Sequence, residues 1–198
     1  MERHTPTHPG AFTARRRRAL AQLAGLLGGA LAAAAGAARA QATPPPSAVV
    51  IDFDLVDDHP NPDTAQQAAL QRRLRQARDD LERQLQDKGL YRIVALQPAR
   101  ALMDKLRNEQ EFMHRCEDCA RQVGQQLDTD YAITGWVQKV SELILNVNIE
   151  VHDVRRKRVV LSKSVDMRGN NDDSWARAVR FLVNDMAAKR QANPKYGT

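Results

Sequence analysis

The chain has two cysteines, and only two residues separate them, in the stretch Cys116-Glu117-Asp118-Cys119. Outside the cytoplasm such a pair can form a structural disulfide, work as an exchangeable redox pair, or supply half of a metal site. Haem attachment would require a histidine after the second cysteine, where this chain has Ala120. A loop this short gains little closure entropy, so a disulfide here would fix the local turn and the helix start. We expect a structural disulfide between Cys116 and Cys119, with the redox pair as the alternative.

A second motif, residues 168–175 (Arg-Gly-Asn-Asn-Asp-Asp-Ser-Trp), combines turn-forming residues, acids and an aromatic ring. Gly169 and Asn170 tolerate positive φ, so the chain can leave a strand in a tight turn. Acidic side chains suit the first turn of a following helix, and Trp175 would anchor that helix on the sheet. The alternative is a ligand or partner site at the helix N-terminus. Its candidate binding residues are Arg168, Asn170, Asp172, Asp173 and Trp175.

Oxygen and nitrogen donors gather at the end of the first expected strand, in Asp52, Asp54, Asp57, Asp58 and His59. Such a group could bind a divalent cation, but strand-end acids are more commonly solvated loop residues. His114 lies two residues before Cys116, whereas His59 and His152 have no ligand-like spacing to it. We expect no metal site and no cofactor.

The sequence contains none of the short motifs that mark common enzyme chemistries. There is no Gly-x-Ser-x-Gly, no His-Glu-x-x-His and no glycine-rich phosphate loop. We therefore expect that the protein is not an enzyme.

The first 40 residues have the layout of a secretory signal peptide. Four arginines at 15–18 precede a run of Ala, Leu and Gly at 19–38, and Ala38-Arg39-Ala40 provides a small-x-small cleavage site. A membrane anchor is the alternative, but Gln22 and the many alanines and glycines make the run weakly apolar. We expect cleavage after residue 40 and export to the periplasm by the Sec or the twin-arginine route.

The charge balance argues against a nucleic-acid partner. Residues 1–40 contain six of the 30 Lys and Arg residues and one of the 24 Asp and Glu residues, so the remainder is nearly neutral. Nucleic-acid binding relies on a clustered basic surface. The basic run that remains, at 155–158, is typical of a solvated hairpin turn. We expect no nucleic-acid partner, and no membrane span after signal cleavage.

Hydrophobic periodicity predicts helices that alternate with short strands. The expected strands are 48–55, 90–96, 130–140, 143–154 and 158–167, and the expected helices are 63–88, 98–111, 116–127 and one that starts at Asp172 or Asp173. Short gaps join the last three strands, so they should pair as an antiparallel meander. We predict an α/β fold in which helices cover a mixed sheet.

The domain organisation follows from composition. Three consecutive prolines at 44–46 predict an extended linker, and the polar C-terminus predicts a flexible tail. What lies between is long enough for one hydrophobic core. We expect a signal peptide at 1–40, a Pro-rich linker at 41–47, a single α/β domain at 48–190 and a flexible tail at 191–198.

A segment in the second half of the chain is similar to TolB amino-terminal-like, CsgG-like and FlgO-like periplasmic domains. It reads Gly124-x-x-Leu127-Asp128-x-Asp130-Tyr131-Ala132-Ile133-Thr134-Gly135-Trp136-Val137, then Asn148-Ile149-x-Val151-x-Asp153-Val154. It departs from the pattern where Arg155-Arg156 replaces the usual Thr-Gly. The cysteine pair and the motif at 168–175 resemble more specifically a family of secreted proteobacterial proteins of unknown function. This resemblance implies a TolB-like fold and a periplasmic location, and it carries over no catalytic residues.

The expected function is therefore an exported, non-enzymatic binding or accessory module in the periplasm. It would act through contacts with periplasmic or outer-membrane proteins. The alternative is a periplasmic thiol–disulfide or redox accessory protein that uses Cys116 and Cys119, and a measured reduction potential would separate the two.

The predicted signal peptide and its cleavage have a direct test. The intact mass of the protein recovered from periplasm should correspond to a chain that begins at Gln41, within a few residues. A full-length product in the cytoplasm would contradict it. Replacing Arg16 and Arg17 with lysine separates the two routes, because only twin-arginine export should collapse.

Overall fold

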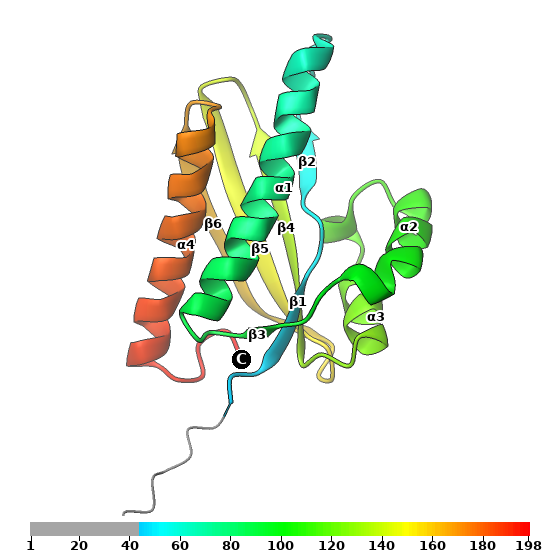
Figure 1. Cartoon of the computed structure of the whole chain (residues 1–198), viewed down its shortest axis with the longest axis vertical. Coiled ribbons are helices and arrows are strands. Elements are labelled where there is room, and N and C mark those ends of the chain that lie inside the picture. Colours follow the sequence, from blue (N-terminus) through cyan, green and yellow to red (C-terminus); the bar gives the residue numbers. More distant parts are fainter. Residues whose placement is uncertain (1–43) are drawn as a thin grey trace, which may run out of the picture. The chain divides into compact units, whose positions relative to one another are not determined.

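A computed structural model describes residues 44–198 of the protein (Figure 1). The predicted signal peptide and the start of the predicted linker lie outside the described residues. The elements, in chain order, are β1 (Ser47–Val50), β2 (Asp54–Asp57), α1 (Thr64–Asp87), β3 (Arg92–Ile93), η1 (Gln97–Ala99), α2 (Arg100–Glu109), η2 (Met113–Arg115), α3 (Cys119–Gln126), β4 (Tyr131–Lys139), β5 (Ile144–Asp153), β6 (Arg158–Arg168) and α4 (Asp172–Ala192). The predicted α/β class is confirmed.

The strands form one mixed sheet in the order β3-β1-β4-β5-β6. β1 and β2 both run parallel to β4, and they pair with its first and second halves. β5 is antiparallel to β4 and to β6. The basic run at 155–158 lies at the β5–β6 turn, where Lys157 has a φ of 53°. In the strand order given above, β6 is the last strand at one side of the sheet.

The predicted strand at 48–55 is two strands, because the register with β4 shifts by one residue between Val50 and Asp54, and Phe53 lies in this break. Its ring occupies the space where a Cβ of residue 135 on neighbouring β4 would lie. Only glycine at position 135 leaves room for this ring, which is 6% exposed. The predicted strand at 90–96 is shorter in the structure, where only Arg92–Ile93 is a strand. The chain leaves the sheet after it, because the Leu96 side chain packs in a second core cluster and the η1 turn follows.

Helices α1 and α4 cover one face of the sheet (Figure 1). The buried residues of α1 are those that its periodicity indicates: Leu70, Leu74, Ala77, Leu81 and Leu85. Asp63 caps its start, and Gly89 follows its end with a φ of 63°. The odd-numbered residues of β4 and β5, such as Ile133, Val147 and Ile149, face these helices.

The opposite face of the sheet is covered only in part. Val49, Ile51 and Ala132 pack there against α2 and α3, through residues that include Met103 and Val123. No described residue of β5 or β6 belongs to this second cluster. The even-numbered residues of those two strands are mainly polar, as expected for a sheet face that meets water.

The end of the segment predicted to be a flexible tail, residues 191–198, contacts the domain, whereas residues 191–195 are exposed. Helix α4 extends to Ala192, and Gly197 is buried. The Tyr91 hydroxyl donates a hydrogen bond to the Gly197 carbonyl, to which Arg190 also donates at 3.3 Å. Burial raises the pKa of Tyr91 to about 12. A buried hydroxyl needs a hydrogen-bond partner, and the end of the chain supplies it.

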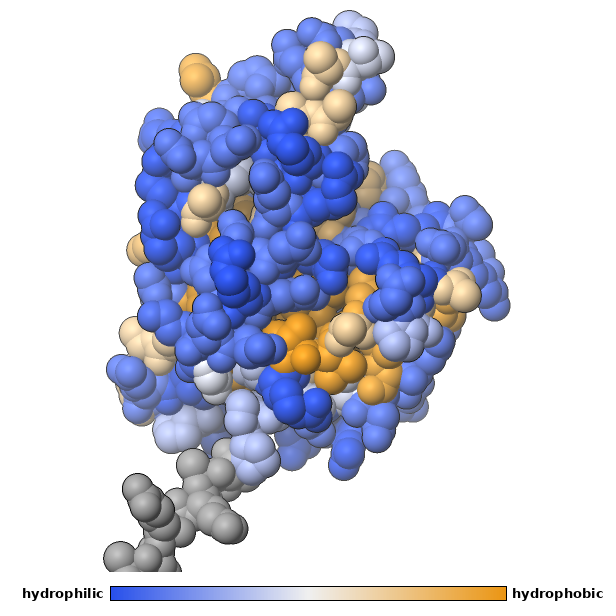
Figure 2. Space-filling model, in the orientation of Figure 1, coloured by the Kyte–Doolittle hydropathy of each residue, from blue (hydrophilic) through white to orange (hydrophobic). Residues whose placement is uncertain are grey.

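The surface over α1 and α4 is predominantly hydrophilic in Figure 2, with a more apolar area beside it over the chain that leads from β3 to α2. Among residues 44–198, the helices lack the combination of length and apolar character needed to cross a membrane.

Candidate functional site

The predicted binding segment at 168–175 forms the turn from β6 into α4. Gly169 has a φ of 84°, and α4 starts at Asp172, as predicted. The N-cap, however, is Asn171 rather than an acid: its side chain accepts from the Ser174 N–H at 3.0 Å, and Ser174 reciprocates in a capping box. Trp175 is 3% exposed and belongs to the core cluster that α1 and α4 form with the sheet.

Three of the five predicted site residues come together at this turn. Trp175 Nε1 donates to Asn170 Oδ1 at 3.1 Å, and Arg73 of α1 contacts both Asn170 Oδ1 (3.2 Å) and Asp172 Oδ1 (2.7 Å). The hydrogen bond from Arg73 lowers the pKa of Asp172. Asn170 also donates to Glu142 at 2.8 Å, which lowers the pKa of that carboxyl. The polar groups of the turn therefore satisfy one another, which is the arrangement of a structural element.

The other two predicted residues lie apart from this cluster. Asp173 is exposed, and no ion pair or side-chain hydrogen bond involves it among the described residues. Arg168 is exposed at the end of β6. Sequence reasoning missed Arg73 and Glu142, because they lie about 100 and 28 residues away from the turn that they hold.

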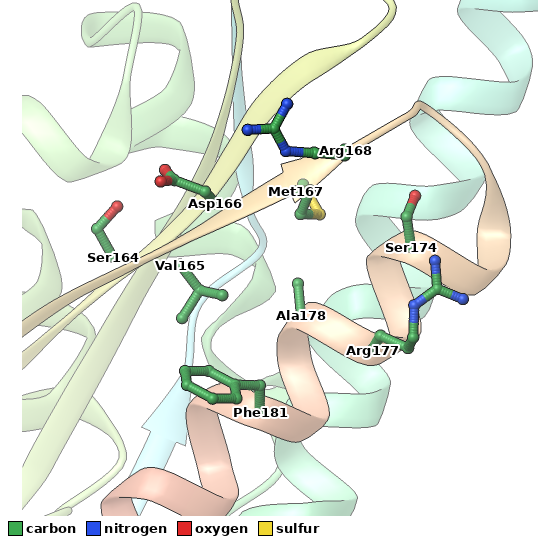
Figure 3. A pocket seen from close by; sticks show the side chains of 9 residues that line it. All are labelled: Ser164, Val165, Asp166, Met167, Arg168, Ser174, Arg177, Ala178 and Phe181. Atoms are coloured by element: carbon green, nitrogen blue, oxygen red, sulfur yellow. The ribbon is translucent and has the colours of Figure 1, made fainter.

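A hollow lies next to this turn, between β6 and α4, and we call it the β6–α4 groove. It has a volume of about 520 Å³. Its lining residues are Ser164, Val165, Asp166, Met167, Arg168, Ser174, Arg177, Ala178 and Phe181. Figure 3 shows that Val165 and Met167 point from the strand toward the helix, whereas Ser164, Asp166 and Arg168 point to the other side of the sheet.

The groove combines an apolar floor with a free cation. Phe181 is 61% exposed, although it lies in a helix whose other apolar residues are largely buried. In Figure 3 its ring extends toward Val165, and Arg177 stands one turn away. Within residues 44–198, no carboxylate lies within the 4.0 Å of an ion pair from Arg177 or Arg168, although many other arginines of the chain are paired.

The backbone of β6 forms the outer rim of the groove. The Gly169 N–H donates a hydrogen bond to the Leu143 carbonyl at 3.1 Å, and this bond identifies which residue pairs of the antiparallel ladder are hydrogen-bonded. Hydrogen-bonded positions alternate in such a ladder, so the odd-numbered residues of β6 from Leu161 onward bond to β5. The even-numbered residues then direct their N–H and C=O groups away from β5, and no described strand pairs with that side. They are Ser162, Ser164, Asp166 and Arg168.

The two cysteines lie on the far side of the domain from this rim, at the start of α3. Their sulfur atoms are at bonding distance, as predicted, and their Cα atoms are 5.5 Å apart. Cys119 is 1% exposed and belongs to the second core cluster.

The acids after β1, predicted to be solvated, are mostly paired with cations. Asp54 is buried and accepts hydrogen bonds from the His114 N–H (2.9 Å) and from His114 Nδ1 (2.8 Å). The His114 ring stacks on Trp136 at a centroid distance of 4.5 Å. Asp57 pairs with Lys139 at 3.1 Å. Among residues 44–198, no three side chains converge as metal ligands would.

A sequence model described as "Protein of unknown function (DUF2380)" matches residues 46–186. The chain belongs to this family, DUF3280. The resemblance to a family of unknown function is thereby confirmed. The search of curated proteins gives no match to the chain.

Solved structures similar to the chain include three bacterial proteins. LpoB of E. coli is 11% identical with a TM-score of 0.47, over 66% of this chain and 60% of its own. The PelC dodecamer from Paraburkholderia phytofirmans is 13% identical with a TM-score of 0.41, over 73% and 87%. TolB from Acinetobacter baumannii is 10% identical with a TM-score of 0.41, over 76% and 29%.

The structural role of Trp175 predicts a clear order of stability changes. Trp175→Ala should lower the free energy of unfolding by about 3–5 kcal/mol, because it opens a large cavity under α4. Asn171→Ala removes the helix cap and should cost about 1 kcal/mol. The exposed control Asp173→Ala should cost at most about 1 kcal/mol, through the helix dipole alone. Urea titrations measure all three, and an unchanged midpoint for Trp175→Ala would refute its anchoring role.

Proposed function

We propose that the protein is an exported, non-enzymatic accessory module of the cell envelope that binds a partner protein by strand addition at the free edge of β6. The observation that carries the proposal is the conjunction of this edge with the β6–α4 groove. In strand addition, backbone hydrogen bonds supply affinity, and pockets for alternate side chains supply specificity. The domain offers both features at one place.

The length and regularity of β6 support this proposal. Natural proteins protect edge strands with prolines, bulges, short strands or inward-pointing charges. β6 has 11 residues and no proline, and its register shift lies at the opposite end, near Val151 and His152. Lys163 does point inward, but Asp185 of α4 pairs with it. The half of β6 that borders the groove is therefore poorly protected against pairing.

The cysteine pair supports export more than it supports redox chemistry. A disulfide persists in an oxidising compartment such as the periplasm, in agreement with the predicted signal peptide. Reactive cysteines sit in partly exposed, electropositive surroundings. Cys119 is buried in the second core cluster, and Glu117 and Asp118 are its preceding neighbours. These surroundings favour a disulfide that fixes the start of α3 over an exchangeable pair.

A proline placed at Ser164 tests the proposed edge. The Ser164 N–H points away from β5, so Ser164→Pro should leave the ladder to β5 intact while it removes a central donor of the rim. Proteins captured from periplasmic extract by the wild-type domain should be lost with Ser164→Pro and kept with the matched control Ser164→Ala. Circular dichroism verifies that both variants fold. A folded proline variant that captures the same proteins would contradict strand addition at β6.

A further inference from the structure

We infer that the segment added to β6 carries an apolar side chain and, two residues away on the same face, a carboxylate. This inference rests on the proposed strand addition and specifies its partner. Side chains of an added strand alternate between the two faces of the sheet. Those that lie level with Val165 and Met167 must face the α4 side and enter the β6–α4 groove (Figure 3).

The spacing along α4 matches the spacing along a strand. Phe181 and Arg177 are four residues apart, so they lie one helical turn, about 5.4 Å, from each other. Same-face residues on a strand are about 6.6–6.8 Å apart. One side chain of the added strand therefore lies beside Phe181 when the next one on that face lies beside Arg177.

The chemistry of the two positions differs. Beside Phe181 the groove is lined by Val165 and Ala178, so an apolar side chain would bury surface that is now exposed. The groove lining near Arg177 includes Ser174, whose hydroxyl already hydrogen-bonds to the Gly169 and Asn171 carbonyls. A carboxylate can form a charge-assisted, bidentate pair with a guanidinium that has no other partner.

The opposite face of the sheet gives no comparable preference. There Arg168 stands two residues from Asp166, so the local charges are mixed. A second copy of this chain is also a poor occupant. Edge-to-edge pairing of two copies would set the side of α4 with Arg177 against the same side of its partner, and like charges oppose each other across an interface.

A palindromic peptide tests the inference without knowledge of the strand direction. The probe is fluorescein-labelled Thr-Val-Thr-Glu-Thr-Ile-Thr-Glu-Thr-Val-Thr, and the matched peptide has Lys in place of both Glu residues. Fluorescence anisotropy should show that the wild-type domain binds the Glu peptide at least about tenfold more tightly. Arg177→Glu should reverse the preference. The control Arg180→Glu changes the same charge outside the groove, and should leave the preference in place.

The outcomes separate this inference from the function on which it rests. Equal affinity for both peptides, with binding lost in Ser164→Pro, would overturn the carboxylate specificity and leave strand addition standing. Absence of binding to either peptide, or binding that Ser164→Pro does not reduce, would overturn both. Sedimentation velocity of the domain alone should show a monomer. A dimer that Ser164→Pro dissociates would assign the edge to a second copy and overturn the inference.

Discussion

The burial of Trp175 in the core that α1 and α4 form with the sheet is the constraint on which the rest of the structure depends. The chain leaves β6 through a turn with Gly169 at positive φ, and within seven residues of the strand's end Trp175 fixes the helix on one face. Asn170 holds the indole N–H and is itself held by Arg73 and Glu142, so α1 and the β4–β5 turn contribute to the same anchor. Because α4 is fixed to the face of the sheet, it borders the edge of β6 without covering it.

The two halves of the domain perform different tasks in this arrangement. On one side, α2, α3 and the cysteine pair build a second core against β1 and β4, and the buried Asp54 holds the loop that carries His114 over Trp136. These polar groups are hydrogen-bonded to one another, as buried polar groups must be. On the other side, Phe181 and Arg177 remain exposed and unpaired beside a strand edge. An exposed apolar side chain and an unpaired guanidinium thus lie together at the β6–α4 groove.

Local pattern predicted the elements well, and it did not predict the contacts between distant parts of the chain. The five buried residues of α1 and the burial of Trp175 follow from helical spacing, which depends on residues close in sequence. The break at Phe53, the pairing of Asp54 with His114 and the docking of Gly197 on Tyr91 depend on partners far along the chain. The free edge could not be predicted either, because it depends on the order of strands in the sheet. Phe181 was the available signal: it is an apolar residue off the buried stripe of α4.

Amide hydrogen exchange along β6 is the measurement that tests the central claim most directly. In the free domain, the N–H groups of Ser162, Ser164 and Asp166 should exchange rapidly, while those of Lys163, Val165 and Met167 should be protected by β5. Saturation with the Glu peptide should slow the first group and leave the second unchanged. Uniform protection along β6 in the free domain, or an unchanged first group with the peptide bound, would contradict the account of β6 as a free edge that accepts a partner strand.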